Sequence, residues 1–154
     1  MAYRNKTYIA FDGTTDIHYY RLMEAWKDND NCDFNFSNAH DLNTARDSSQ
    51  EESIKAQLRK RFAISKQLIV LIGEETRYST PFVKWELEVA LRLDLPIIAV
   101  NLNKARRADD RCPPPIVGEL AIFVPFRQKI IVHAIDTWAG EHAKYRREGR
   151  TGAA

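Results

Sequence analysis

Two runs of apolar residues, Leu68–Ile72 and Pro96–Val100, constrain the fold of this chain more than any other feature. The first run is apolar at every position, which is typical of a parallel strand buried on both faces of a sheet. The second run repeats this signature, and a helical pattern that opens at Thr80-Pro81 lies between the two. A strand, a helix and a second strand in this order predict a parallel sheet with helices packed against it.

Two further short apolar runs, Tyr8–Phe11 and Ile122–Phe126, are predicted strands, and Phe34–Ser37, in which phenylalanine alternates with polar residues, has a weaker strand pattern. Helical patterns separate these runs, and the first of them has apolar positions at Tyr19, Leu22, Met23 and Trp26. The sequence therefore predicts one α/β domain over residues 1–154, with a flavodoxin-like, five-stranded parallel sheet and helices on both faces. We expect the core to span about residues 7–140, and residues 141–154 to form a basic, solvated helix end.

The composition excludes several classes of protein. The formal charge of +2 arises from 23 basic and 21 acidic residues, so no global field favours nucleic acid or a membrane surface. The longest apolar runs are far shorter than the roughly 20 residues of a membrane-spanning helix. Cys32 and Cys112 belong to no CxxC or Cys/His pair, and the four histidines lack ligand spacing. We therefore expect a cytoplasmic protein with no metal, no tightly bound cofactor, and histidines that are exposed or locally hydrogen-bonded.

The helix after Thr80-Pro81 contains an unusual glutamate. At 3.6 residues per turn, one stripe of this helix contains Phe82, Glu86, Val89 and Leu93, and the opposite face contains Lys84, Glu88 and Arg92. Glu88 therefore has cations as its helical neighbours, whereas Glu86 is directed towards the interior. An unpaired carboxylate is expensive to bury and is usually retained because it binds or catalyses something. The alternative is that Glu86 lies at the edge of the stripe and reaches a basic partner or solvent.

Ligands in parallel α/β folds bind outside the carboxyl ends of the strands. This rule selects residues that follow the predicted strands, namely Phe11, Asp12, Gly13, Ser37, Asn38, the segment 73–80 and Asn101. Asp12 has an equally good interpretation as a turn-forming residue ahead of glycine. The chain has no GxGxxG and no GxxxxGK[ST] motif, so a dinucleotide fingerprint and a P-loop are both absent. Gly73 stands where a phospho-receiver domain would need an aspartate.

Several segments resemble a known family. The run Ser65–Ile72, the pair Tyr78-Ser79 and the run Phe82–Glu86 look like the third strand, the following loop and the next helix of a TIR domain. The opening Tyr8–Asp12 is similar to the first strand of the bacterial, Thoeris-type TIR group. The sequence departs from many TIR domains at Phe82-Val83, where those have a tryptophan-cysteine pair. It also has Ala10 in place of a serine and lacks an arginine-aspartate-glycine element after the second strand.

The resemblance implies an enzyme that cleaves the nicotinamide–ribose bond of NAD, with NAD as substrate rather than as bound cofactor. It implies that Glu86 is the catalytic residue, and the product would be a signalling nucleotide such as a cyclic ADP-ribose isomer. The expected substrate-binding residues are Phe11, Asp12, Gly13, Ser37, Asn38, Tyr78, Phe82 and Trp85.

The expected partners are other copies of the chain and a separate effector protein reached by the nucleotide product. Two alternatives stay open, a non-catalytic TIR module that binds other TIR domains and a nucleotide-binding sensor without turnover.

Overall fold

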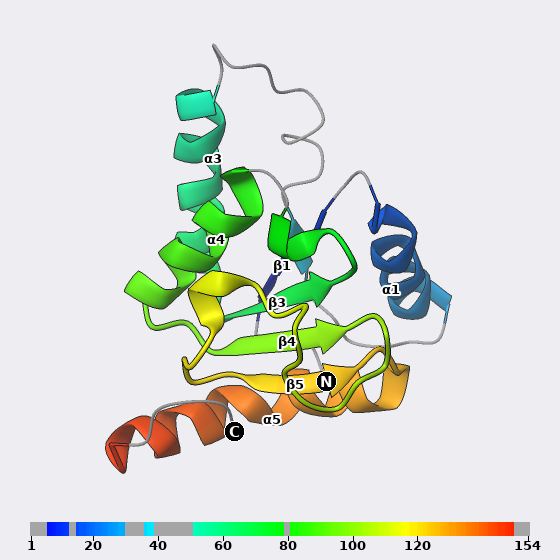
Figure 1. The fold of residues 1–154 in the computed structure, drawn as a ribbon. Coiled ribbons are helices and arrows are strands. Elements are labelled where there is room, and N and C mark those ends of the chain that lie inside the picture. Colours follow the sequence, from blue (N-terminus) through cyan, green and yellow to red (C-terminus); the bar gives the residue numbers. More distant parts are fainter. Residues whose placement is uncertain (1–5, 13–14, 30–35, 39–50, 79–80, 150–154) are drawn as a thin grey trace.

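The computed structural model describes residues 6–12, 15–29, 36–38, 51–78 and 81–149 of the chain (Figure 1). Its strands are β1 (Thr7–Ala10), β2 (Phe36–Asn38), β3 (Gln67–Ile72), β4 (Ile97–Asn101) and β5 (Ile122–Pro125). Its α-helices are α1 (Ile17–Asn29), α3 (Glu51–Ile64), α4 (Pro81–Arg92) and α5 (Gln128–Arg147). Two short 3₁₀ helices, η2 (Thr76–Tyr78) and η3 (Pro114–Ile116), lie in the connections.

The strands form one sheet in the order β2-β1-β3-β4-β5, and every pair of neighbours is parallel. This order is that of a flavodoxin-like doubly wound sheet, in which the chain changes direction across the sheet between β1 and β3. The predicted class, a parallel α/β domain with helices on both faces, is therefore confirmed. The strands β3 and β4 are buried along their whole length, as the two apolar runs predict.

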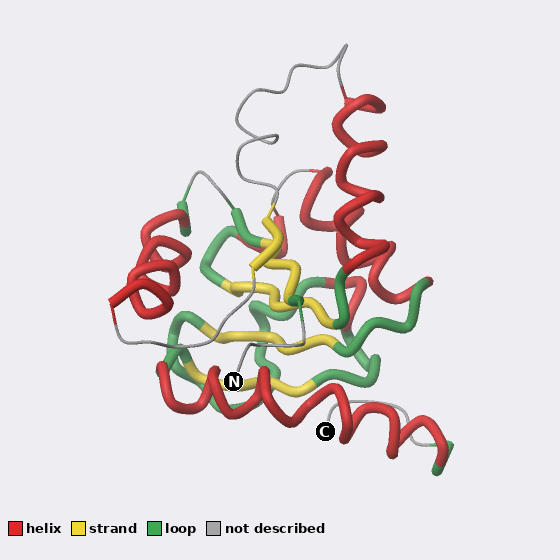
Figure 2. Tube along the Cα trace, turned by 180° about the vertical axis from the view of Figure 1, so that it is seen from behind, coloured by secondary structure: helices red, strands yellow, loops and turns green. Residues whose placement is uncertain are grey.

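Helices cover the two faces of the sheet in pairs. On one face, α3 and α4 pack over side chains that include Tyr8, Leu68 and Val70. Figure 1 shows these two helices together, away from α1. On the other face, α1 and α5 pack over a second core that includes Ile9 and Ile69. Figure 2 shows the molecule from behind, with α5 running along the strands β4 and β5. Successive residues of each strand therefore belong to different cores, as the period of two requires.

A buried amide joins three elements in the α1/α5 core. The Nε2 group of Gln67, at the start of β3, donates to Thr7 Oγ1 of β1 over 3.1 Å and to the carbonyl oxygen of Ile135 in α5 over 3.1 Å. Both Thr7 and Gln67 are fully buried. A buried amide that lost its acceptor would lower the unfolding free energy by about 1–3 kcal/mol. The bond from Gln67 to Ile135 therefore helps to hold α5 against the sheet.

The first helix is predicted in the right place but with one wrong position. Met23 is buried as expected, whereas Leu22 is 46% exposed. Tyr20 is buried in its place and stacks on Phe11, with 5.0 Å between ring centres. The buried face of α1 is therefore centred on Tyr20 and Met23, three residues apart, and Leu22 lies beside it.

The expectation of a solvated basic helix end after residue 140 is wrong for His142 and Arg146. Helix α5 continues to Arg147, and His142 within its last turns is 4% exposed. Arg146 binds Asp94, with 2.8 Å between Nη2 and Oδ1, and His142 Nε2 lies 3.6 Å from the same oxygen. Burial lowers the pKa of His142. The end of α5 is therefore docked against the turn between α4 and β4.

Among the helices in the described part of the chain, none is both long and apolar enough to cross a membrane.

Candidate active site around Glu86

Helix α4 places Glu86 in the protein interior. The helix begins at Pro81, a residue whose fixed φ suits the first helical position, and its buried side chains include Val83, Leu87 and Ala90. Glu86 is 1% exposed, so the prediction from helical spacing is confirmed. Glu88, two residues further on, is exposed as expected.

The predicted stripe on α4 is wrong at its far end. Leu93 is 53% exposed because the helix ends at Arg92 and the chain turns at Asp94, which has a positive φ of 52°. The centre of the buried face lies at Val83, Leu87 and Ala90, so Glu86 borders that face rather than marking its middle.

One side chain from β1 holds the carboxyl group of Glu86. The Tyr8 O–H donates a hydrogen bond to Glu86 Oε2, and Tyr8 is fully buried. The other oxygen, Oε1, has no hydrogen-bond partner among the residues that the structure describes. Burial raises the pKa of Glu86 from 4.5 to about 8, and the hydrogen bond from Tyr8 acts in the opposite direction. Burial and the neighbouring carboxyl group also raise the pKa of Tyr8 well above 10.

Aromatic rings surround this pair on the side of α3. Tyr8 is stacked on Phe62 of α3, with 4.1 Å between ring centres and 13° between ring planes. Trp85 meets the same Phe62 edge-on, at 6.1 Å and 78°. The Trp85 ring is half-buried, and Lys55 Nζ and Arg59 Cζ each lie 5.5 Å from its centre. Trp85 is thus next to Glu86 in the helix but is directed towards α3.

A second buried carboxyl group lies at the carboxyl ends of β1 and β3. Asp16 is 5% exposed, and Thr76 Oγ1 lies 3.4 Å from its Oδ2 atom. The same Oγ1 accepts a hydrogen bond from the N–H of Gly73 over 2.8 Å. Burial first, and then the charge of Asp12, raise the pKa of Asp16. A side chain at Gly73 would force the Asp16 carboxyl group to shift, because a Cβ atom there would lie 2.5 Å from Asp16 Oδ1.

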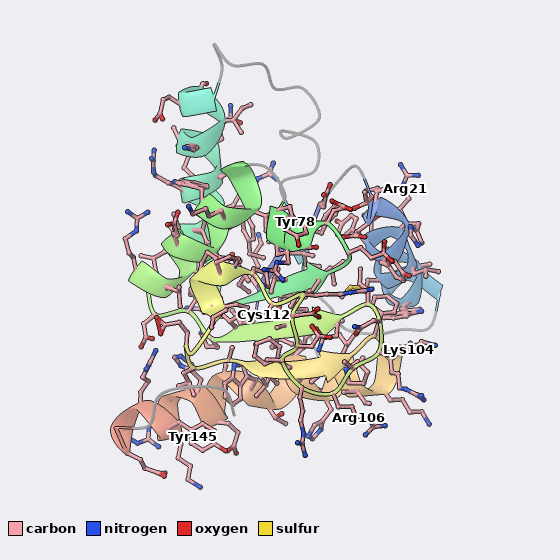
Figure 3. All side chains as sticks on the ribbon, in the orientation of Figure 1. Arg21, Tyr78, Lys104, Arg106, Cys112 and Tyr145 are labelled. Carbon is pink, nitrogen blue, oxygen red and sulfur yellow. The ribbon has the colours of Figure 1, made fainter. Side chains whose placement is uncertain are left out.

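Apart from Phe11 and Trp85, the predicted substrate-binding residues fall into three groups. Asp12 is half-buried at the end of β1, and its carbonyl oxygen accepts from the N–H of Asp16 over 2.8 Å. Tyr78 is 72% exposed after β3, with Arg77 Cζ 5.1 Å from its ring centre (Figure 3). Outside the described residues lie Gly13 and the side chains of Ser37, Asn38 and Phe82.

The expected place of Phe11 beside Glu86 is wrong. Phe11 belongs to the α1/α5 core, where it stacks on Tyr20, whereas Tyr8 and Glu86 lie on the α3/α4 face. The reason is the period of two in the extended chain, because a separation of three residues puts Tyr8 and Phe11 on opposite faces.

The segment after β4 is held at the same edge of the sheet. Asn101, the last residue of β4, is buried, and its Nδ2 group donates to the carbonyl oxygens of Ala105 and Arg107, each over 3.0 Å. Lys104 and Arg106 extend outwards from this segment (Figure 3). The basic half of this connection is thus exposed, whereas Cys112 further along is buried as a free thiol in the α3/α4 core.

Sequence reasoning missed Tyr8 and Asp16 as parts of the site. Both side chains reach residues distant in sequence, namely Glu86 and Thr76. The described residues also contain no group of three or more histidine, cysteine or acidic side chains that could hold a metal ion.

The fold and the site define a class of protein, a doubly wound α/β domain with a buried glutamate in the helix that follows its central strand. Residues 8–107 match the family model described as Thoeris protein ThsB, TIR-like domain, and the chain belongs to this family. The match includes Tyr8, Asp16 and Glu86, and it ends before β5 and α5.

Proposed function

We propose that this protein is an enzyme that cleaves the nicotinamide–ribose bond of NAD and makes a nucleotide signal in bacterial anti-phage defence. The observation that carries the proposal is the carboxyl group of Glu86, which is 1% exposed and has one oxygen without a partner among the described residues. Retaining such a group in a core costs stability and is typical of functional sites. Membership of the Thoeris TIR-like family supports the same assignment.

The chemistry needs one ionised carboxylate. When the bond between ribose C1′ and the nicotinamide nitrogen breaks, nicotinamide leaves as a neutral molecule with the bonding electron pair and needs no proton. The ribose becomes an oxocarbenium-like cation, and the Glu86 carboxylate would stabilise this charge as the carboxylates of glycosidases do. An acceptor then bonds to C1′ and loses its proton. Water as acceptor gives ADP-ribose, whereas a group of the same molecule gives a cyclic product, so exclusion of water decides the outcome.

The proposal also includes the substrate, the cellular location, the target of the product and the assembly of the protein. NAD is the substrate rather than a tightly held cofactor, and the protein acts in the cytoplasm, where NAD is available. The nucleotide product acts on a separate effector protein. Contacts between copies of the chain raise the fraction of molecules with a competent site, because a binding event that favours one conformation shifts its population.

A second candidate function is a non-catalytic module that binds other TIR domains. The burial of Glu86 favours it, because a carboxyl group that is 1% exposed and bound to Tyr8 does not meet a ligand in this conformation. Catalysis therefore requires that the α4 face opens to admit the ribose, whereas an assembly module requires no such opening.

The experiment that separates the two candidates compares two glutamine variants of helix α4. Purified protein is incubated with NAD, and the nucleotides are identified by mass spectrometry. We expect Glu86→Gln to abolish turnover, because the amide keeps the size of the side chain but loses the charge that stabilises the cation. The matched control Glu88→Gln changes an exposed carboxylate on the same helix and should leave turnover nearly unchanged. Equal loss in both variants, or activity retained in Glu86→Gln, would refute the assignment.

A further inference from the structure

Tyr8 is the described side chain that binds the carboxyl group of Glu86. Its phenol O–H donates to Oε2, while Oε1 has no partner among the residues that the structure describes. The two residues are 78 positions apart in sequence and come from β1 and α4. The hydrogen bond therefore depends on the packing of this helix against this strand.

Both the backbone and the ring of Tyr8 are held in place. Tyr8 lies in β1 between two parallel neighbours, opposite Ser37 of β2 and Leu68 of β3. Its ring is fully buried and stacked on Phe62 at 4.1 Å, so rotation of the ring out of its position would break that stack. A hydrogen-bond donor held in this way orients its acceptor, because the carboxyl group must turn one oxygen towards it.

We infer that Tyr8 is the residue that positions Glu86 for catalysis, by holding Oε2 and leaving Oε1 as the oxygen that meets the ribose. This inference rests on the function proposed for Glu86. Tyr8 itself touches no reacting atom in this arrangement, so it is a positioning residue.

The same hydrogen bond affects the charge of Glu86. A donor to a carboxyl group favours the ionised form, and it opposes the burial that raises the pKa of Glu86. Among the described residues, charged groups on the neighbouring elements do not replace this hydrogen bond. The positive charge of Arg61 in α3 lowers the pKa of the Tyr8 phenol. Lys55 and Arg59 of the same helix lie over the ring of Trp85. On α4 itself, Lys84 and Glu88 are exposed. On the face of β3 that packs against α4, the residues are apolar.

The test is Tyr8→Phe, which removes the hydroxyl group and keeps the ring that stacks on Phe62. The control is Tyr20→Phe, which removes a hydroxyl from a tyrosine that is 4% exposed in the opposite core. Two quantities are measured across pH. One is kcat/KM for NAD, whose pH dependence reports groups of the free enzyme. The other is the infrared C=O band of the protonated carboxyl group, isolated by subtracting the spectrum of Glu86→Gln.

We expect Tyr8→Phe to move the midpoint of both curves upward by about one pH unit, because a hydrogen bond to a charged group is lost. Below both midpoints the variant should be about tenfold slower than the wild type, and the two rates should converge at alkaline pH. Tyr20→Phe should leave both curves in place. A purely structural role would lower the rate equally at every pH and leave the infrared midpoint unchanged, and that result would overturn the inference.

The infrared measurement separates this inference from the proposed function. If the wild type cleaves no NAD but the band still shifts in Tyr8→Phe, the proposed function fails and the control of Glu86 by Tyr8 stands. If Tyr8→Phe does not fold, 3-fluorotyrosine at position 8 replaces it as the test. This residue keeps the size of the ring and is a stronger donor, so it should move the infrared midpoint downward. An unchanged midpoint would overturn the inference.

Discussion

Replacing Glu86 by glutamine should make the protein more stable, by an amount that grows with pH. In the folded protein, burial raises the pKa of Glu86 from 4.5 to about 8. Between these values the unfolded chain has released the proton and the folded chain still holds it. Stability therefore falls as pH rises from 4.5 to about 8, since the folded state binds the additional proton. The glutamine side chain has no such proton, so the stability of the variant does not fall with pH for this reason.

The magnitude follows from the two pKa values. Their difference, at about 1.4 kcal/mol for each pH unit, amounts to about 5 kcal/mol by pH 8. This is the largest value that burial allows, because any local opening that hydrates the carboxyl group lets it ionise at less cost. Domains of this kind have unfolding free energies of about 5–15 kcal/mol, so even half of the effect is easily measured.

The assay is urea unfolding of the wild type and of Glu86→Gln at pH 4.5, at pH 8 and at values between them. The difference in unfolding free energy between the two proteins isolates Glu86, because the other titrating groups are common to both. It should be small at the acidic end, grow through the range and level off above about pH 8. Glu88→Gln is the matched control and should show no such growth, since Glu88 is exposed. A Glu86→Gln difference that stays constant across pH would refute the reasoning.

Three further predictions concern Gly73 at the carboxyl edge of the sheet, Gly140 in α5 and the assembly of the protein. Gly73→Ala should lower the unfolding free energy by about 1–3 kcal/mol, because the new Cβ atom would lie 2.5 Å from Asp16 Oδ1. Gly140→Ala in α5, where nothing lies within 4 Å of the new atom, should instead raise it by about 0.5–1 kcal/mol in the same urea measurement. NAD cleavage per molecule should rise with protein concentration, as expected if contacts between copies complete the site. A high rate that is independent of concentration, measured on a verified monomer, would contradict this last prediction.

The fold was predictable because its central strands have a distinctive apolar sequence pattern. The strand β3 is apolar at Leu68–Ile72 since both of its faces are covered, and this pattern is typical of a buried parallel strand. The edge strand β2 is described over Phe36–Asn38, so the predicted strand Phe34–Ser37 is confirmed at Phe36 and Ser37, its end is placed one residue too early, and Phe34 and Asn35 lie outside the described residues. An edge strand has a neighbour on one side alone, so its sequence pattern is weaker and its ends are harder to predict.

The site was predictable only where one element determined it. The burial of Glu86 follows from its place on its own helix, so spacing along α4 was enough. Tyr8 and Asp16 bind residues that are 78 and 60 positions away, and no local pattern identifies such partners. For Phe11 the local signal was present, because a residue three positions after Tyr8 in a strand lies on the other face. The prediction placed it by its nearness to the strand end and ignored that alternation.

The buried amide of Gln67 has a consequence for how much of the chain is needed to make a working protein. Residues 8–107 match the family, yet Gln67 donates to Ile135, and to Thr7, the residue immediately before Tyr8. A fragment limited to the matched residues would lose both acceptors, together with the α5 side chains that fill one core. We therefore expect the smallest unit that folds around Glu86 to be longer than the segment by which the family is recognised, and to include the last helix.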